Sequence, residues 1–111
     1  MGNKAWLGEF EQVVLLAVLQ LNTNAYGFGV QQEIQRRTGR TCSIGAIYTT
    51  LDRMEQKGFV SSWMGEPTPE RGGRAKKYFR VEGAGEAALR HSYAATNSMI
   101  AGLEPLLGGA R

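Results

Sequence analysis

Residues 43–58 have the sequence Ser-Ile-Gly-Ala-Ile-Tyr-Thr-Thr-Leu-Asp-Arg-Met-Glu-Gln-Lys-Gly, and they carry the clearest structural signal of the chain. The hydroxyl of Ser43 can accept a hydrogen bond from an unpaired N–H of a first helical turn, which is typical of a helix N-cap. Apolar residues follow at steps of three, four and three: Ile44, Ile47, Leu51 and Met54. Lys57 and Gly58 are favourable at a helix C-terminus. This segment therefore predicts a helix with one buried face.

The opposite face of this predicted helix carries polar groups and short side chains. It holds Gly45, Tyr48, Thr49, Asp52, Arg53 and Gln56. Such a face suits a helix that enters the major groove of DNA, which is ~12 Å wide and admits a helix. An ordinary solvated face has the same pattern, so periodicity alone leaves both interpretations open.

Two helices are predicted before this segment. Residues 9–21 repeat apolar side chains at three- and four-residue steps, and Leu15, Leu16 and Leu19 make the other side apolar as well. This helix therefore needs a second partner, which we expect to be the C-terminal helix or another subunit. Residues 26–38 predict the second helix, which ends before Gly39.

After Gly58 the pattern changes from helical to extended. Residues 59–64 and 77–81 are rich in aromatic and β-branched residues with polar positions between them, which predicts two strands. The segment that joins them contains prolines and a Gly-Gly pair, so we expect a hairpin with a long tip. Five basic side chains fall between residues 71 and 80, in the tip and the second strand: Arg71, Arg74, Lys76, Lys77 and Arg80. They can neutralise phosphates, although a solvated charged loop fits their position equally well.

Helical patterning returns after Glu82. A coiled-coil seam at alternating four- and three-residue steps is formed by Leu89, Tyr93, Thr96, Ile100, Leu103 and Leu107. Such a short seam needs a partner, so we expect residues 1–81 to form a DNA-binding domain and residues 82–111 a dimerisation helix. A terminal helix packed on its own domain is the alternative. The residues expected at the subunit interface are Leu15, Leu19, Leu89, Tyr93, Ile100, Leu103 and Leu107.

Composition limits the classes of function. The 111 residues carry a net charge of +3 and a single cysteine, Cys42, which excludes an internal disulfide framework. No signal-peptide pattern or membrane-spanning run is found, so we expect a cytoplasmic protein with no membrane contact. No phosphate-binding loop, metal-ligand cluster or nucleophile–base set is found either. The sequence therefore predicts neither an enzyme nor a metal or cofactor, and Cys42 is expected to be a packing residue rather than a redox sensor.

Several motifs together resemble the PadR family of bacterial transcriptional regulators. They are residues 7–17, Ala25-Tyr-Gly27, residues 47–58, Ser61-Ser-Trp63, residues 66–74 and Lys77-Tyr-Phe-Arg80, and they reach to about Leu89. The resemblance implies a mainly α fold with a small β-hairpin, a winged helix-turn-helix with a C-terminal dimerisation helix. It also implies a homodimeric repressor that binds a palindromic operator in double-stranded DNA and is often released by a small ligand. The single C-terminal helix resembles the short branch of the family.

One departure from the family affects the last helix. Many relatives begin it with Thr-Pro-x-Gly, whereas this chain has Glu82-Gly-Ala-Gly85, which lacks the capping hydroxyl. The residues expected to contact DNA are Ser43, Gly45, Tyr48, Thr49, Arg53, Arg71, Arg74, Lys76 and Lys77. Tyr48 is expected to give its hydroxyl to a phosphate while its ring supports the hairpin, with a purely structural tyrosine as the alternative. Arg53 can contact phosphate or guanine, or pair with a nearby carboxylate.

The two tryptophans are candidates for an effector site. Trp63 lies in the first strand, where we expect it to pack within the hairpin. Trp6 precedes the first helix and, in a dimer like that of the family, lies near the subunit interface, so it is our candidate for stacking a small aromatic effector. A winged-helix module that binds protein is the alternative function. The basic hairpin favours DNA, because a protein-binding face usually carries an exposed apolar anchor.

Overall fold

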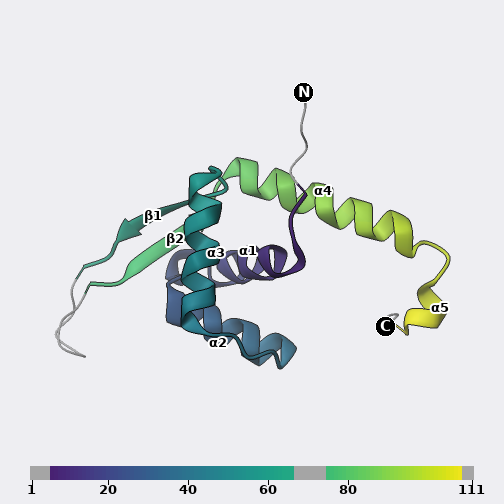
Figure 1. Cartoon of the computed structure of the whole chain (residues 1–111), viewed down its shortest axis with the longest axis horizontal. Helices are drawn as coiled ribbons and strands as arrows, with labels where there is room; N and C mark the ends of the chain where they lie inside the picture. Colours follow the sequence, from purple (N-terminus) through teal and green to yellow (C-terminus); the bar gives the residue numbers. More distant parts are fainter. Residues whose placement is uncertain (1–5, 67–74, 109–111) are drawn as a thin grey trace.

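The computed structural model describes residues 6–66 and 75–108, and its elements follow the predicted order. In chain order they are α1 (Glu9–Leu21), the 3-10 turn η1 (Asn22–Asn24), α2 (Gly27–Thr38), α3 (Ile44–Gln56), β1 (Val60–Met64), β2 (Lys77–Val81), α4 (Gly83–Ile100) and α5 (Glu104–Leu107). Helices α1, α2 and α3 form one body, from which the β-hairpin extends on one side and α4 on the other (Figure 1). The predicted mainly helical fold with a small hairpin is confirmed.

Helix α1 lies at the centre of this body. It packs against α2, α3, β2 and α4, and Val14, Leu15 and Val18 are at most 1% exposed. Because four elements surround α1, Leu15 lies inside the core of the single chain, which contradicts its predicted place at a subunit interface. The apolar surface that α1 leaves exposed is formed by Leu16 and Leu19.

The turn between α2 and α3 is fixed by side-chain hydrogen bonds. Ser43 is the N-cap of α3, as predicted, and its hydroxyl oxygen accepts the N–H of Ala46 at 3.0 Å. The side-chain amide of Gln31 in α2 donates to the carbonyl of Cys42 at 2.7 Å. Cys42 itself is partly buried against the core, in agreement with its predicted packing role. These contacts set the position of α3 relative to α2.

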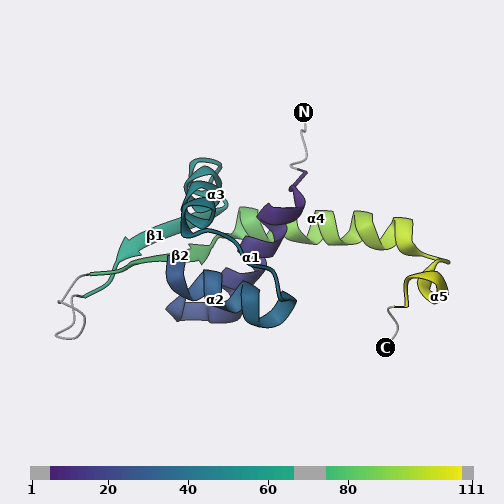
Figure 2. The ribbon, with the colours of Figure 1, turned by 60° about the horizontal axis from the view of Figure 1, so that its bottom comes forward.

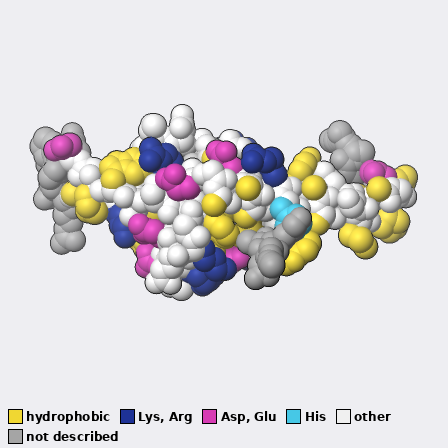
Figure 3. Space-filling view, turned by 90° about the horizontal axis from the view of Figure 1, so that it is seen from above, with side chains coloured by type: hydrophobic (Ala, Val, Ile, Leu, Met, Phe, Trp, Pro, Cys, Tyr) yellow, Lys and Arg dark blue, Asp and Glu magenta, His cyan; other side chains and the backbone are white. Residues whose placement is uncertain are grey.

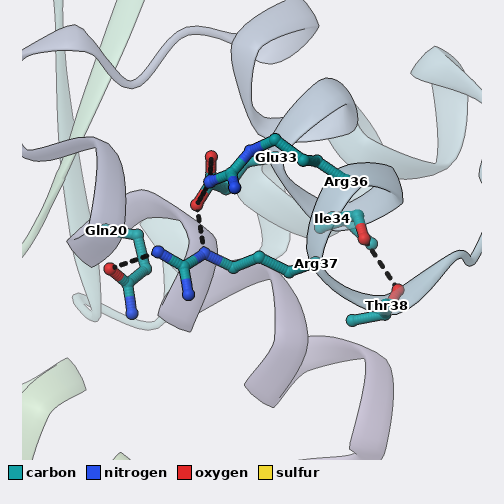
Figure 4. Close-up of polar contacts among 6 residues, drawn as sticks. All are labelled: Gln20, Glu33, Ile34, Arg36, Arg37 and Thr38. Carbon is teal, nitrogen blue, oxygen red and sulfur yellow. Dashed lines mark hydrogen bonds and ion pairs between the residues drawn. The ribbon is translucent and has the colours of Figure 1, made fainter.

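The second half of α2 carries a buried carboxylate with two arginine partners on the same helix. Glu33 is only 8% exposed and pairs with Arg36, at 2.9 Å, and with Arg37 (Figure 4). Hydrogen bonds from Arg37 and then Arg36 lower the pKa of Glu33 below its usual value, although desolvation opposes them. Arg37 also donates to Gln20 of α1 at 3.1 Å. Of these contacts, the hydrogen bond between Arg37 and Gln20 joins α2 to α1.

The hairpin is attached to the helical body along β2. Strands β1 and β2 are antiparallel and pair from Val60 opposite Val81 to Met64 opposite Lys77. Phe79 is fully buried, and its backbone N–H donates to the carbonyl of Ala25, just before α2, at 2.8 Å. The hairpin therefore has a defined direction relative to α2 and α3.

Helix α4 leaves the body after its first turns. In a second view it still projects outward, and α5 turns back from its far end (Figure 2). The predicted continuous seam is interrupted, because α4 ends at Ile100 and Gly102 adopts a left-handed φ of 90°. Leu103 and Leu107 therefore do not continue the helical register of Leu89 and Tyr93. No helix in the described ranges is both long and apolar enough to cross a membrane.

Candidate nucleic-acid interface

Helix α3 has the predicted buried stripe with one exception. Ile47, Leu51 and Met54 have no exposed surface. Ile44 is instead 40% exposed, because it lies in the first turn beyond the edge of the core, and it lines a surface groove. The opposite side of α3 is exposed along its length at Gly45, Thr49, Asp52 and Gln56. A continuous outward face is therefore available for contact with another molecule.

Tyr48 connects α3 to both of its neighbours. Its ring centroid is 6.5 Å from that of Phe79 in β2, so it supports the hairpin as predicted. Its far end lies over the first residue of α2: a Cβ added at Gly27 would be 2.4 Å from the Tyr48 hydroxyl oxygen. The hydroxyl is thus held beside the N-terminus of α2 while 37% of the residue remains exposed.

A groove of about 850 Å³ brings α2, α3 and the hairpin together. It is lined by Tyr26, Phe28, Gln31, Ile44, Tyr48, Met64, Ala75, Lys76 and Lys77. The Lys76 ammonium lies 4.4 Å from the centroid of the Tyr26 ring. The Lys77 ammonium lies 3.9 Å from Oε1 of Glu55, a distance at which an exposed pair contributes little. Of the predicted DNA contacts, this groove therefore unites Tyr48, Lys76 and Lys77.

Arg53 lies away from this groove and pairs with α1. Its Nε is 3.2 Å from Oε2 of Glu11, and the Lys57 ammonium is 3.9 Å from the same oxygen. The other Glu11 oxygen accepts the backbone N–H of Gly8 at 2.8 Å. Burial raises the pKa of Glu11, but the Gly8 N–H and the two cations outweigh burial, so the pKa is lowered overall. Of the two roles open to Arg53, the structure favours pairing with a carboxylate.

The remaining predicted DNA contacts are less constrained. Ser43, Gly45 and Thr49 are exposed at the start of α3. The Ser43 oxygen accepts the capping bond, and its hydroxyl hydrogen remains available to donate. Arg71 and Arg74 lie outside the described residues.

Two exposed apolar residues of the groove were not predicted as functional from the sequence. Phe28 and Met64 are 54% and 62% exposed. Phe28 lies between Gly27 and Gly29 at the start of α2. A bulky residue between two glycines at a helix start is the sequence signal that could have indicated this position. Met64 gives no such signal, because alternation along a short strand does not say which face is covered.

A second groove, of about 360 Å³, lies between α1 and α4. It is lined by Gln12, Leu16, Leu19, Glu86, Leu89, Arg90 and Tyr93, which include three predicted interface residues. Leu19 is 40% exposed and Tyr93 70%, whereas Leu89 is nearly buried. Apolar side chains also remain exposed at the far end of α4 and on α5, among them Met99, Leu103, Leu106 and Leu107 (Figure 3, right).

Trp6, the candidate effector-binding residue, is exposed and lies beside α4. It is 67% exposed, and its ring centroid is 4.4 Å from that of His91. Within residues 6–66 and 75–108, Nε2 of His91 and the hydroxyl of Ser92 are buried without a hydrogen-bond partner. The same part of the chain contains no group of three or more His, Cys, Asp or Glu side chains that could hold a metal ion.

Three helices followed by a hairpin attached through β2 define a winged helix-turn-helix protein. Residues 15–91 match the family model described as the transcriptional regulator PadR-like family. The chain therefore belongs to this family of DNA-binding transcriptional regulators, which are not enzymes. This confirms the resemblance found in the sequence.

The chain is also similar to individual proteins. A PadR-like transcriptional regulator from Bacillus cereus is 20% identical, with a TM-score of 0.68 over 91% of this chain and 93% of that one. A PadR family transcriptional regulator from Eggerthella lenta is 24% identical, with a TM-score of 0.65 over 92% and 88%. An uncharacterized protein of Lysinibacillus sphaericus is 29% identical over 84 residues, which are 74% of this chain and 72% of that protein. The likeness to the two solved structures supports the fold.

Proposed function

We propose that the chain is a homodimeric repressor that binds a palindromic operator in double-stranded DNA. In this proposal α3 enters the major groove and the hairpin lies beside it over the phosphate backbone. The supporting observation is the groove in which Tyr48, Lys76 and Lys77 meet the first turn of α2. Residues 1–81 then act as the DNA-binding domain and residues 82–111 as the dimerisation element.

A phosphate fits the chemistry of this groove. The N-terminus of α2 presents unpaired backbone N–H groups and the positive end of the helix dipole. The Tyr48 hydroxyl lies beside it, over Gly27. Lys76 stands over Tyr26, the residue that precedes α2. A hydrogen-bond donor, a cation and a helix N-terminus thus surround one position, as expected for a contact that places α3 on the duplex without selecting a base.

The exposed apolar surfaces support a dimer through α1, α4 and α5. From His91 to Leu103 the chain carries no aspartate, glutamate, lysine or arginine, and the centre of a subunit interface is typically poor in charged residues. Tyr93 and Leu19 are exposed at the groove between α1 and α4. A twofold axis there would give two copies of α3 for two half-sites, spaced by one helical turn or a multiple of it.

The proposal includes release of the operator by a small aromatic effector that stacks on Trp6. An indole that is two thirds exposed offers an open face, and its neighbour His91 belongs to α4. An effector at Trp6 would therefore contact the helix proposed to join the subunits.

The experiment is fluorescence anisotropy of labelled DNA taken from the region upstream of the protein's own gene, across a salt series. We expect selective binding over unrelated DNA of equal length, two chains bound per site, and affinity that falls steeply with salt. Equal affinity for both DNAs, or no binding at low salt, would overturn the proposal.

The exposed apolar side chains of the groove favour one second candidate, a module that binds protein. Phe28, Ile44 and Met64 form the apolar anchor that such a surface usually carries. This candidate gains support only if the protein fails to bind DNA selectively. Substitution of Phe28 by Ser then tests whether a captured partner depends on the groove.

A further inference from the structure

The first two turns of α3 expose little that could form hydrogen bonds with bases. Successive residues of a helix are 100° apart, so the outward stripe of α3 is formed by Gly45, Thr49, Asp52 and Gln56. It lies opposite Ile47 and Leu51, which are fully buried. The N-terminal residues of a recognition helix lie nearest the base edges. In this chain those positions on the stripe are Gly45 and Thr49.

The long side chains that commonly recognise guanine and adenine are absent from this position. Arg53, the only arginine of α3, is directed to Glu11 on α1 at 3.2 Å. Gln56 is the last residue of the helix. Recognition through a bidentate Arg–guanine or Gln–adenine pair therefore has no candidate in the first two turns.

Gly45 has no structural explanation within the chain. It lies inside a helix with an ordinary helical φ, where alanine is more favourable. A Cβ there would meet only the Ser43 hydroxyl oxygen, at 4.0 Å. This distinguishes it from Gly27 and Gly85, where a Cβ would lie 2.4 Å from other atoms. An absent side chain on the outward face allows the helix backbone to approach another surface closely.

We infer that Thr49 recognises a thymine in each operator half-site through methyl–methyl contact, with Gly45 allowing the approach. This inference rests on the proposed function. Thr49 is exposed one turn after Gly45, and its γ-methyl is the kind of group that packs on the C5 methyl of thymine. Its hydroxyl can add a hydrogen bond to the same base pair. The ligand class is thus a half-site with thymine at the centre of the α3 contact.

The test begins with selection of binding sequences from a random DNA pool by the full-length protein. We expect an enriched inverted repeat in which one thymine per half-site is strongly preferred. Replacing that thymine by deoxyuridine removes only the C5 methyl, and we expect about fourfold weaker binding per half-site, the value of one buried methyl group. The control replaces a thymine outside the repeat and should leave affinity unchanged.

Two matched variants distinguish the contribution of the Thr49 methyl group to thymine recognition from that of its hydroxyl. Thr49→Ser removes the methyl and should bind thymine and deoxyuridine sites equally. Thr49→Val keeps a methyl in place and should still discriminate between the two sites. If Thr49→Ser discriminates as well as the wild-type protein, another residue contacts the thymine and the inference is wrong.

The variant Gly45→Ala distinguishes a role of Gly45 in the approach to DNA from a role in folding. We expect its Tm to rise by roughly 4 °C, because alanine favours the helix, while affinity for the selected site falls roughly tenfold. Unchanged affinity would refute the role of Gly45. If no sequence is enriched from the pool, the proposed function itself fails. If a repeat is enriched but deoxyuridine has no effect, only the thymine inference fails.

Discussion

Gly85, in the first turn of α4, has no room for a side chain. A Cβ there would lie 2.4 Å from the carbonyl oxygen of Phe59 and 2.9 Å from Cγ1 of Val81. The same carbonyl accepts the N–H of Glu82 at 2.8 Å, so this oxygen cannot shift without weakening a backbone hydrogen bond. We expect Gly85→Ala to destabilise the protein by about 2–3 kcal/mol, the upper part of the range for overpacking, because the clash is with backbone.

Gly83, two residues earlier in α4, provides the matched control. A Cβ there would meet nothing within 4 Å, and the residue has no positive φ. Gly83→Ala should therefore be neutral or stabilise by up to about 1 kcal/mol. Thermal unfolding followed by circular dichroism measures both variants, and Gly85→Ala should lower the Tm by roughly 10 °C. A Tm within about 2 °C of the wild-type value for Gly85→Ala, or an equal loss in both variants, would refute the close approach of α4 to the hairpin.

Three further predictions concern the groove, the ion pair between Arg53 and Glu11, and the proposed subunit interface. Lys76→Gln should weaken DNA binding at all sequences and reduce the slope of log affinity against log salt by about one unit, and an unchanged slope would argue against a phosphate contact. Glu11 has a lowered pKa, so its stabilising charge is present above its unfolded pKa near 4.5 and is lost as the pH falls. Glu11→Gln should therefore cost up to about 1 kcal/mol at neutral pH and reduce the loss of Tm on acidification, whereas an equally steep acid profile would contradict this assignment. Leu19→Glu should keep the circular dichroism spectrum of the wild type but sediment as a monomer at concentrations where the wild type is a dimer, and an unchanged sedimentation coefficient would exclude Leu19 from the interface.

The parts of the fold that were predicted correctly depend on local signals. The Ser43 cap and the apolar steps after it fix the start and the phase of α3, because a hydroxyl acceptor and a 3.6-residue period act within one or two turns. The strand 77–81 and its partner follow from alternation and from the glycines and prolines between them. In each case, the residues that determine the structure lie within a few positions of one another.

The errors concern contacts between residues far apart in the chain. Periodicity shows that α1 is apolar on all sides but not which side each neighbour covers, so it predicts Leu15 at a subunit interface, although four elements of its own chain surround this residue. Ile44 continues the stripe of α3, yet the core ends before its turn. Periodicity predicts a seam that continues through Gly102, but the left-handed φ of Gly102 ends the helical register. The Arg53–Glu11 pair joins residues 42 positions apart, which no local pattern indicates.

The two ends of the molecule differ in how completely a single chain buries its apolar surface. Beneath α3 the core is closed, since Ile47, Leu51 and Met54 have no exposed surface, and the apolar side chains that stay exposed there line a single groove: Phe28, Ile44 and Met64. Along the end of α4 and on α5, Met99 and Leu106 are 78% and 79% exposed. Burial of such side chains contributes roughly 1.5–3 kcal/mol each, so the proposed second subunit would stabilise the end of the chain that is least complete. Dimerisation also joins two half-site contacts, and the second binds at the high effective concentration set by the first. In this proposal operator occupancy depends more steeply than linearly on protein concentration wherever the dimer dissociates, because each operator binds two chains.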